Sequence, residues 1–164
     1  MKALVVYYSL TGVSRQLALT VANELGADKV AITTVKELSA KKMFPLAPMS
    51  IFGKAAINPV QVNPRDYDLI VLATPVWIGR PAAPLVTWLK SVTLTQKDVA
   101  LLLTYRDQAG NAMPKLEKLV SGARVIDRLA LQTKNHPQSE LDEQARLWAD
   151  ELTEDIQRLD AATE

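Results

Sequence analysis

Residues 2–14 decide the fold, and they read Lys2-Ala3-Leu4-Val5-Val6-Tyr7-Tyr8-Ser9-Leu10-Thr11-Gly12-Val13-Ser14. Residues 2–8 form a continuous apolar run, which is typical of a strand buried on both faces. A hydroxyl-rich turn ends this run at residue 9, and a helical pattern follows at once. The stretch therefore predicts a buried strand that leads through a short polar turn into a helix.

The turn combines three hydroxyls, one glycine and the free amide N–H groups of a helix N-terminus, and such a turn can receive a phosphate. It contains no Lys or Arg, so hydroxyls, backbone dipoles and the helix end would hold a dianion there. This suits a permanently held phosphate monoester better than a nucleotide triphosphate. The alternative is that the hydroxyls only cap the helix. We favour the ligand site, with Ser9, Leu10, Thr11, Gly12, Val13 and Ser14 as its residues.

Length and composition indicate one globular domain over residues 1–164. Apolar residues make up 48% of the chain, which excludes a disordered chain. The absence of Cys excludes disulfides, thiolate metal sites and cysteine catalysis. The only histidine, His136, lies in a polar stretch, so neither a Ser-His-Asp triad nor a histidine metal cluster is expected. We expect no metal site and assign no catalytic residue.

The charges are unevenly distributed. Residues 137–164 contain nine acids and two arginines, a balance of −7; because the whole chain carries +1, the remainder carries +8. The basic residues form no run, so we expect no nucleic acid partner. No apolar run approaches the roughly 20 residues that span a bilayer, and we expect no signal peptide and no membrane span. The lack of Cys fits a cytoplasmic protein.

Apolar periodicity and Gly positions divide the chain into alternating strands and helices. The predicted strands are residues 2–8, 28–34, 69–73, 98–104 and 124–131. The predicted helices are residues 13–25, 82–90, 111–121 and 138–159. Such alternation predicts a doubly wound α/β fold, in which helices cover both faces of a parallel sheet. Residues 35–64 are the least regular, and we expect a long crossover with one short helix around 49–56.

Ligands bind open α/β sheets beyond the carboxyl ends of the strands. Here the first such turn carries the phosphate site, and the turns after the third and fourth strands carry Trp77 and Tyr105. A planar heterocycle with a phosphate tail would fit all three turns. Trp77 is expected to stack on this ligand or to contact its edge, with loop packing as the alternative. For Tyr105, ligand contact and loop packing both remain open. Trp88 and Trp148 lie at helical spacing among apolar residues, which predicts core positions.

These motifs, in this order, resemble the flavodoxin family. Residues 9–14 after the first strand resemble its FMN phosphate loop, and residues 68–79 resemble its second flavin loop with the lead-in strand. Residues 101–104, with the Gly-containing turn and helix after them, resemble the third loop. The resemblance covers nearly the whole chain. It implies a five-stranded sheet of order 2-1-3-4-5 with FMN at the point where the strand order reverses. Flavodoxin is the standard example of this topology.

The resemblance also implies the cofactor-binding residues. Ser9, Thr11 and Ser14 would hold the FMN phosphate, together with the backbone amides of residues 10–13. The isoalloxazine ring and ribityl chain would be lined by Thr74, Pro75, Val76, Trp77, Ile78 and Gly79. The pyrimidine side of the ring would be approached by Thr104, Tyr105, Arg106 and Gly110. This chain departs from the family in being nearly neutral, and its third loop offers one arginine and one acid where electron carriers often place several acids.

Two other classes with related topology are excluded. A receiver domain needs acidic residues after the first strand and a phosphoacceptor Asp after the third, where this chain has Ser9 and Thr74. A P-loop nucleotidase needs Gly-Lys-Ser/Thr after the first strand, and this chain has no Lys there.

Two functions remain. The favoured one is electron transfer between redox partner proteins. The alternative is an FMN-dependent oxidoreductase that takes electrons from NAD(P)H and reduces a quinone or another small molecule, with the apolar crossover 43–52 either roofing a pocket or serving as core.

Overall fold

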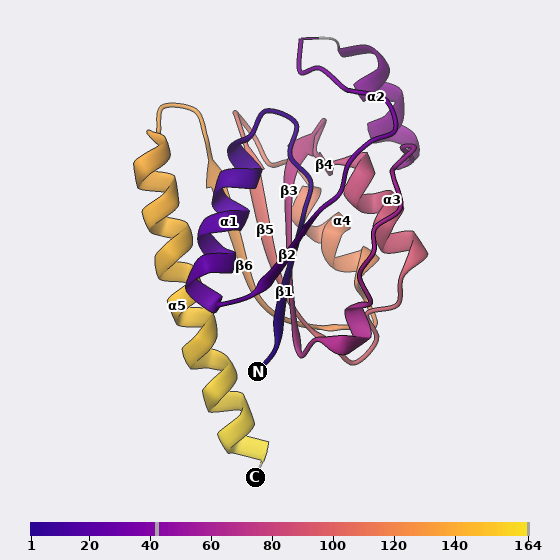
Figure 1. Cartoon of the computed structure of the whole chain (residues 1–164). Helices are drawn as coiled ribbons and strands as arrows, with labels where there is room; N and C mark the ends of the chain where they lie inside the picture. The colour runs from indigo at the N-terminus through magenta and orange to yellow at the C-terminus, as the bar shows by residue number, and fades with distance from the viewer. Residues whose placement is uncertain (42, 164) are drawn as a thin grey trace.

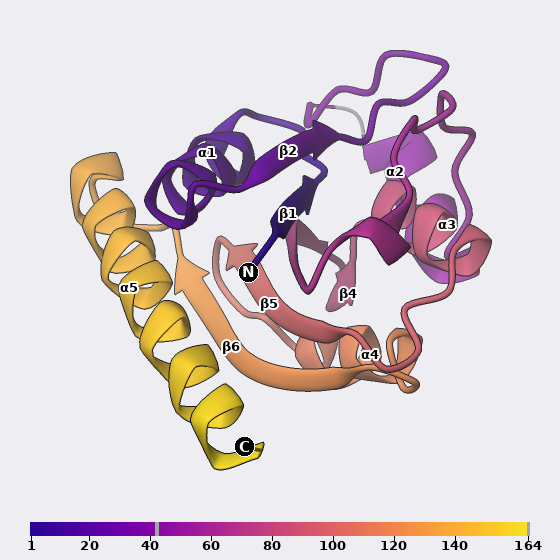
Figure 2. The same cartoon turned by 60° about the horizontal axis from the view of Figure 1, so that its bottom comes forward.

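The computed structural model describes residues 1–41 and 43–163, without the side chains of residues 43–45. Five parallel strands form the sheet, in the order β2 (Asp28–Ala31), β1 (Ala3–Tyr7), β3 (Leu69–Trp77), β5 (Asp98–Tyr105) and β6 (Arg124–Gln132). The predicted order 2-1-3-4-5 is confirmed, because the additional strand β4 (Arg80–Pro81) only pairs antiparallel with the end of β3. Figures 1 and 2 show the twisted sheet at the centre of the molecule.

Helices cover both faces of the sheet, as predicted. On one face lie α1 (Val13–Leu25) and α5 (Gln138–Thr163), and on the other lie α3 (Ala83–Ser91) and α4 (Ala112–Leu119) (Figure 1). The crossover from β2 to β3 carries α2 (Met43–Phe52), above α3 in Figure 1, and a short 3₁₀ helix, η1 (Pro64–Asp66). None of the helices described is long and apolar enough to cross a membrane.

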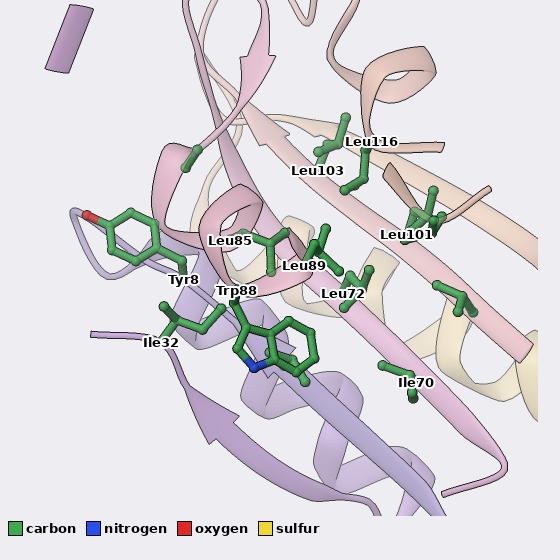
Figure 3. Close-up of a cluster of buried hydrophobic side chains, with 14 of the residues drawn as sticks. Tyr8, Ile32, Ile70, Leu72, Leu85, Trp88, Leu89, Leu101, Leu103 and Leu116 are labelled. Atoms are coloured by element: carbon green, nitrogen blue, oxygen red, sulfur yellow. The ribbon is translucent and has the colours of Figure 1, made fainter. Parts of the chain in front are cut away.

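The sheet is buried on both sides, and this explains the unbroken apolar strands. Along β1, Leu4 and Val6 point to the core under α3 and α4, whereas Val5 points to the core under α1 and α5. Both predicted core tryptophans are confirmed: Trp88 is 2% exposed and Trp148 is 4% exposed, one in each core. Figure 3 shows Trp88 packed among leucines of α3 and of the strands.

The predicted short helix was placed too late in the chain. It spans Met43–Phe52 rather than 49–56, because Gly53 has φ 58° and ends it in the left-handed conformation. Pro48 lies inside this helix and obscured its pattern. The second strand ends at Ala31, three residues earlier than predicted.

The third strand is longer than predicted. It runs to Trp77 instead of ending at residue 73, since Thr74 and Pro75 continue the pairing with β5. Ile78 and Gly79 then form a two-residue hairpin turn to Arg80, with φ 49° and 64°. Positive φ at both central residues is the type I′ geometry, which favours Asn-Gly and is unusual for a β-branched residue. The Ile at the first turn position concealed this hairpin from the sequence analysis.

Candidate functional site

A cavity of about 550 Å³ lies beyond the carboxyl ends of β1, β3 and β5. Its volume is within the range of cofactor sites, and its position is the one expected for a ligand in an open α/β sheet. Eleven of the predicted site residues line it: Leu10, Thr11, Val13, Ser14, Pro75, Val76, Trp77, Ile78, Thr104, Tyr105 and Arg106. The three turns that the sequence analysis singled out thus meet at one site.

Residues 9–12 form the turn at the N-terminus of α1. Gly12 is the N-cap residue with φ 100°, and no side chain caps the helix. The Ser9 hydroxyl instead accepts a hydrogen bond from the Gly12 N–H, at 3.0 Å. The N–H groups in the first turn of a helix lack intrahelical acceptors, so those of Val13 and Ser14 remain able to bind a ligand. The three hydroxyls therefore do not serve as helix caps, which was the alternative interpretation.

Two buried hydroxyls join this turn to the middle of the sheet. Ser14 is 3% exposed and Thr104 is 4% exposed, and their side-chain oxygens lie 2.8 Å apart in a hydrogen bond. Because one hydroxyl donates to the other, the pair keeps a free O–H on one of the two residues. Thr11, by contrast, is exposed and lines the cavity, and its hydroxyl has no hydrogen-bond partner among the described residues. This end of the cavity is polar and uncharged.

Trp77 and Ile78 form an apolar part of the cavity lining. Trp77 is 7% exposed, and its ring meets Tyr8 edge to face, with centroids 5.4 Å apart and planes at 88°. Burial raises the pKa of Tyr8 to about 12, so the tyrosine remains neutral in this contact. Trp77 therefore packs against the core and lines the cavity at the same time. Ile78 is 55% exposed at the tip of the hairpin, where an apolar side chain can cover one face of a ring.

Five predicted site residues do not line the cavity but shape its turns: Ser9, Gly12, Thr74, Gly79 and Gly110. Thr74 is fully buried, and its hydroxyl donates to the Pro75 carbonyl and accepts from the Ala82 N–H. A Cβ at Gly110, where φ is 56°, would lie 2.9 Å from the Cα of Gly79. These two glycines let the second and third turns approach each other backbone to backbone.

Arg106 is the sole charged residue among the described residues that line the cavity. Its guanidinium lies 3.7 Å from the carboxylate of Asp107, and its side chain is 81% exposed. Lys134 donates to the same carboxylate at 2.6 Å, and this hydrogen bond lowers the pKa of Asp107 below its usual value. Asp107 therefore stays ionised and offsets part of the positive charge beside the cavity.

Four lining residues were not predicted from the sequence: Ala40, Leu46, Ser50 and Thr133. Thr133 directly follows β6, so the carboxyl-end rule applied to the fifth strand would have found it. Leu46 and Ser50 are one turn apart on α2, and the Ser50 hydroxyl donates to the Leu46 carbonyl at 2.8 Å. The crossover thus lines the cavity through Leu46 and Ser50, and Leu46 is also part of the core. The side chains of Met43 and Phe44 lie outside the described residues.

The ionisable side chains in the described lining are those of Tyr105 and Arg106. None of the described lining residues is a carboxylate or a histidine. Among the described residues, no group of three or more His, Asp or Glu side chains is arranged to hold a metal ion. Its uncharged polar end matches a phosphate, and its apolar and aromatic wall matches a planar ring.

Solved structures similar to this chain include flavoproteins and flavodoxins. A flavoprotein from Lactobacillus acidophilus NCFM, solved in complex with FMN, superposes with a TM-score of 0.70 at 21% identity, covering 87% of this chain and 97% of that one. A flavodoxin from Streptococcus pneumonia TIGR4 has a TM-score of 0.60 at 17% identity, covering 93% and 98%. A flavodoxin, WrbA-like protein from Agrobacterium tumefaciens has a TM-score of 0.60 at 20% identity, covering 90% and 92%.

The sequence itself matches no protein-family model and no curated protein. The likeness therefore rests on the arrangement of the elements, over nearly the full length of both chains in each comparison. The chain has the flavodoxin-like fold.

Proposed function

We propose that the chain binds FMN non-covalently in the 550 Å³ cavity and acts in electron transfer. The observation that carries the proposal is that one cavity joins the uncharged hydroxyl turn at α1 to the wall formed by Trp77 and Ile78. The fold is shared with a Lactobacillus flavoprotein that was solved in complex with FMN. When bound, FMN would supply the one- and two-electron chemistry.

The residues of the chain would bind and orient the cofactor. Thr11 and the free N–H groups of the first turn of α1 would hold the phosphate, while Ser9 and Gly12 keep the turn in shape. Trp77, Ile78 and Tyr105 would exclude water from the ring. A flavin held this way would keep one edge toward solvent, because Ile78 and Arg106 lie exposed at the rim.

The favoured role is that of a carrier between redox proteins. A carrier needs an exposed cofactor edge and a docking face, and it needs no catalytic acid or base. The lining residues described fit this role, since they include no carboxylate or histidine.

The alternative is an FMN-dependent oxidoreductase, and one observation favours it. Leu46 and Ser50 of α2 line the same cavity as the three turns, so the crossover adds a further wall where a small substrate could be enclosed. An enzyme needs such a wall and also a site for its electron donor.

Two measurements on the purified chain separate these proposals. Reconstitution with FMN and gel filtration should leave a yellow protein with flavin absorption bands, and a colourless protein would refute FMN binding. The yellow protein is then mixed with NADH or NADPH and a quinone. A carrier gives no turnover above that of free FMN, whereas saturable turnover would establish the oxidoreductase.

A further inference from the structure

A second groove, of about 460 Å³, lies beside the cofactor cavity. It runs between the end of α2, strand β4 and helices α3 and α4, which lie on the same side of the sheet in Figure 1. Ser50 lines both the groove and the cavity, and Arg80 directly follows the Ile78-Gly79 turn. A molecule in the groove would therefore touch the rim of the cofactor site.

Four cations surround this groove: Arg80, Lys90, Lys115 and Lys118. Within the described part of the chain, none of them forms an ion pair with a carboxylate. Glu117 lies between the two lysines of α4 in sequence, but its carboxylate pairs with Arg128. The groove consequently presents uncompensated positive charge.

Apolar side chains stand beside these cations. Phe52 is 77% exposed and Ile51 is 58% exposed, both at the end of α2. Phe52 has the largest exposed fraction among the large apolar residues described. Exposed aromatic residues are enriched at the centre of protein interfaces, where they bury against the partner, and the surrounding rim is polar.

We propose that this basic groove is the docking surface for an acidic redox protein whose apolar contact buries Phe52. The inference rests on the proposed electron-transfer function and adds the chemistry of the partner. Complementary charge would guide the partner to the groove and orient it. Because Ser50 lines both the groove and the cavity, a partner in the groove would lie next to the cofactor.

A protein fits the groove better than a small anion does. Small-ligand pockets are concave and enclose most of the ligand's surface, but Phe52 projects with three quarters of its own surface exposed. The acidic helix α5 of a second copy is a less suitable occupant. Its contact with the groove would pair two different surfaces of the chain. Such a contact builds open filaments unless the rotation between neighbouring copies closes them into a ring.

The test titrates the ¹⁵N-labelled, FMN-loaded chain with an acidic [2Fe–2S] ferredoxin, and in parallel with a basic cytochrome c, while amide shifts are recorded. We expect the ferredoxin to shift amides around Phe52, Gly53 and Lys118, and the cytochrome to leave them unchanged. The affinity should fall at least about tenfold between roughly 20 mM and roughly 200 mM salt, because the charges are exposed.

Matched variants locate the contact. Lys118→Glu and Phe52→Ala should each weaken ferredoxin binding at least about fivefold, as expected for a charge contact and an aromatic anchor. Lys29→Glu changes the same charge on the exposed edge strand β2, and Leu147→Ala removes an exposed apolar side chain from α5. Both controls should bind like the wild type.

Several results would overturn the proposal: no shifts at low salt, equal binding of the basic cytochrome, shifts confined to another face, or equal losses in the control variants. Shifts of the groove amides on concentrating the chain alone would show that a second copy occupies it. Flavin absorbance recorded before each titration reports FMN binding separately. The same titration on the FMN-free chain tests the groove even if the cofactor proposal fails.

Discussion

The two ends of the cofactor cavity are built differently. At the polar end, hydroxyls bond to other groups of the protein: Ser9 to the Gly12 N–H, and Ser14 to Thr104. At the ring end, Ile78 lies exposed, and its hairpin is held by close contact between Gly79 and Gly110. The polar end is therefore fixed by hydrogen bonds before any ligand arrives, whereas the ring end depends on packing between turns.

Removing Trp77 should have the largest effect, because this side chain belongs to both the core and the cavity. Trp77→Ala should lower the free energy of unfolding by about 3–5 kcal/mol, as for other large-to-small core substitutions. In the folded fraction, the fluorescence of bound flavin should increase, since the indole ring no longer quenches it. Chemical denaturation and flavin emission measure the two effects. Trp77→Phe keeps the aromatic contact with Tyr8 and serves as the control. Unchanged quenching in Trp77→Ala would assign Trp77 to packing alone.

Gly110→Ala tests whether backbone contact holds the ring end. The new Cβ would lie 2.9 Å from the Gly79 Cα at a φ of 56°, so strain and overpacking together should cost about 2–4 kcal/mol of unfolding free energy. FMN and riboflavin should lose affinity equally, because the ring is common to both.

Gly26→Ala is the matched control for this substitution. Its φ is 58°, but its Cβ would meet nothing within 4 Å, so only the strain of about 1 kcal/mol remains. Equal destabilisation by the two variants would show that the contact between the two turns is unimportant.

Thr11→Val tests the polar end alone. The loss of one hydrogen bond to a charged group should cost about 1.5–3 kcal/mol, which lowers FMN affinity roughly tenfold to a hundredfold. Riboflavin has no phosphate, and its affinity should stay the same. Isothermal titration of both ligands gives the comparison directly. Equal losses for FMN and riboflavin would place Thr11 away from the phosphate.

Arg106→Gln should have the smallest effect, because the side chain is 81% exposed and lies beside Asp107. Full reduction of FMN places negative charge on the ring, and a nearby cation favours this charge. At ~6 Å and a dielectric constant near that of water, Coulomb's law gives about 30 mV for one electron. The semiquinone/hydroquinone potential should become more negative by this amount, and less so at high salt. Arg65→Gln, in η1, should change nothing. If the two variants have the same potential in a redox titration, the side chain of Arg106 lies away from the flavin ring.

The fold was predictable because its signals are local. Apolar runs mark the buried strands, and Gly26 ends α1 as expected. The exceptions are segments where a local preference is overruled. Pro48 lies inside α2, and Ile78 occupies a turn position that disfavours β-branched residues. Single-sequence patterns assign such residues to loops, because the tertiary contacts that hold them come from residues far away in the sequence.

The site was predictable as far as the strand ends determine it. The rule that ligands bind beyond the carboxyl ends identified the three turns, but contacts from the crossover could not be found this way. Ala40 and Leu46 reach the cavity only through the path of residues 35–64, which has no regular pattern. The role of Gly110 was also hidden, because its contact with Gly79 joins two turns far apart in the sequence.

The most direct test is calorimetric titration of the purified chain with FMN and with riboflavin under the same conditions. We expect one FMN to bind per chain, at least about a hundredfold more tightly than riboflavin, since several charge-assisted hydrogen bonds at the turn of residues 9–14 reach only the phosphate. Equal affinities for the two ligands, or no binding of FMN, would contradict the assignment of this cavity as a phosphate-anchored flavin site.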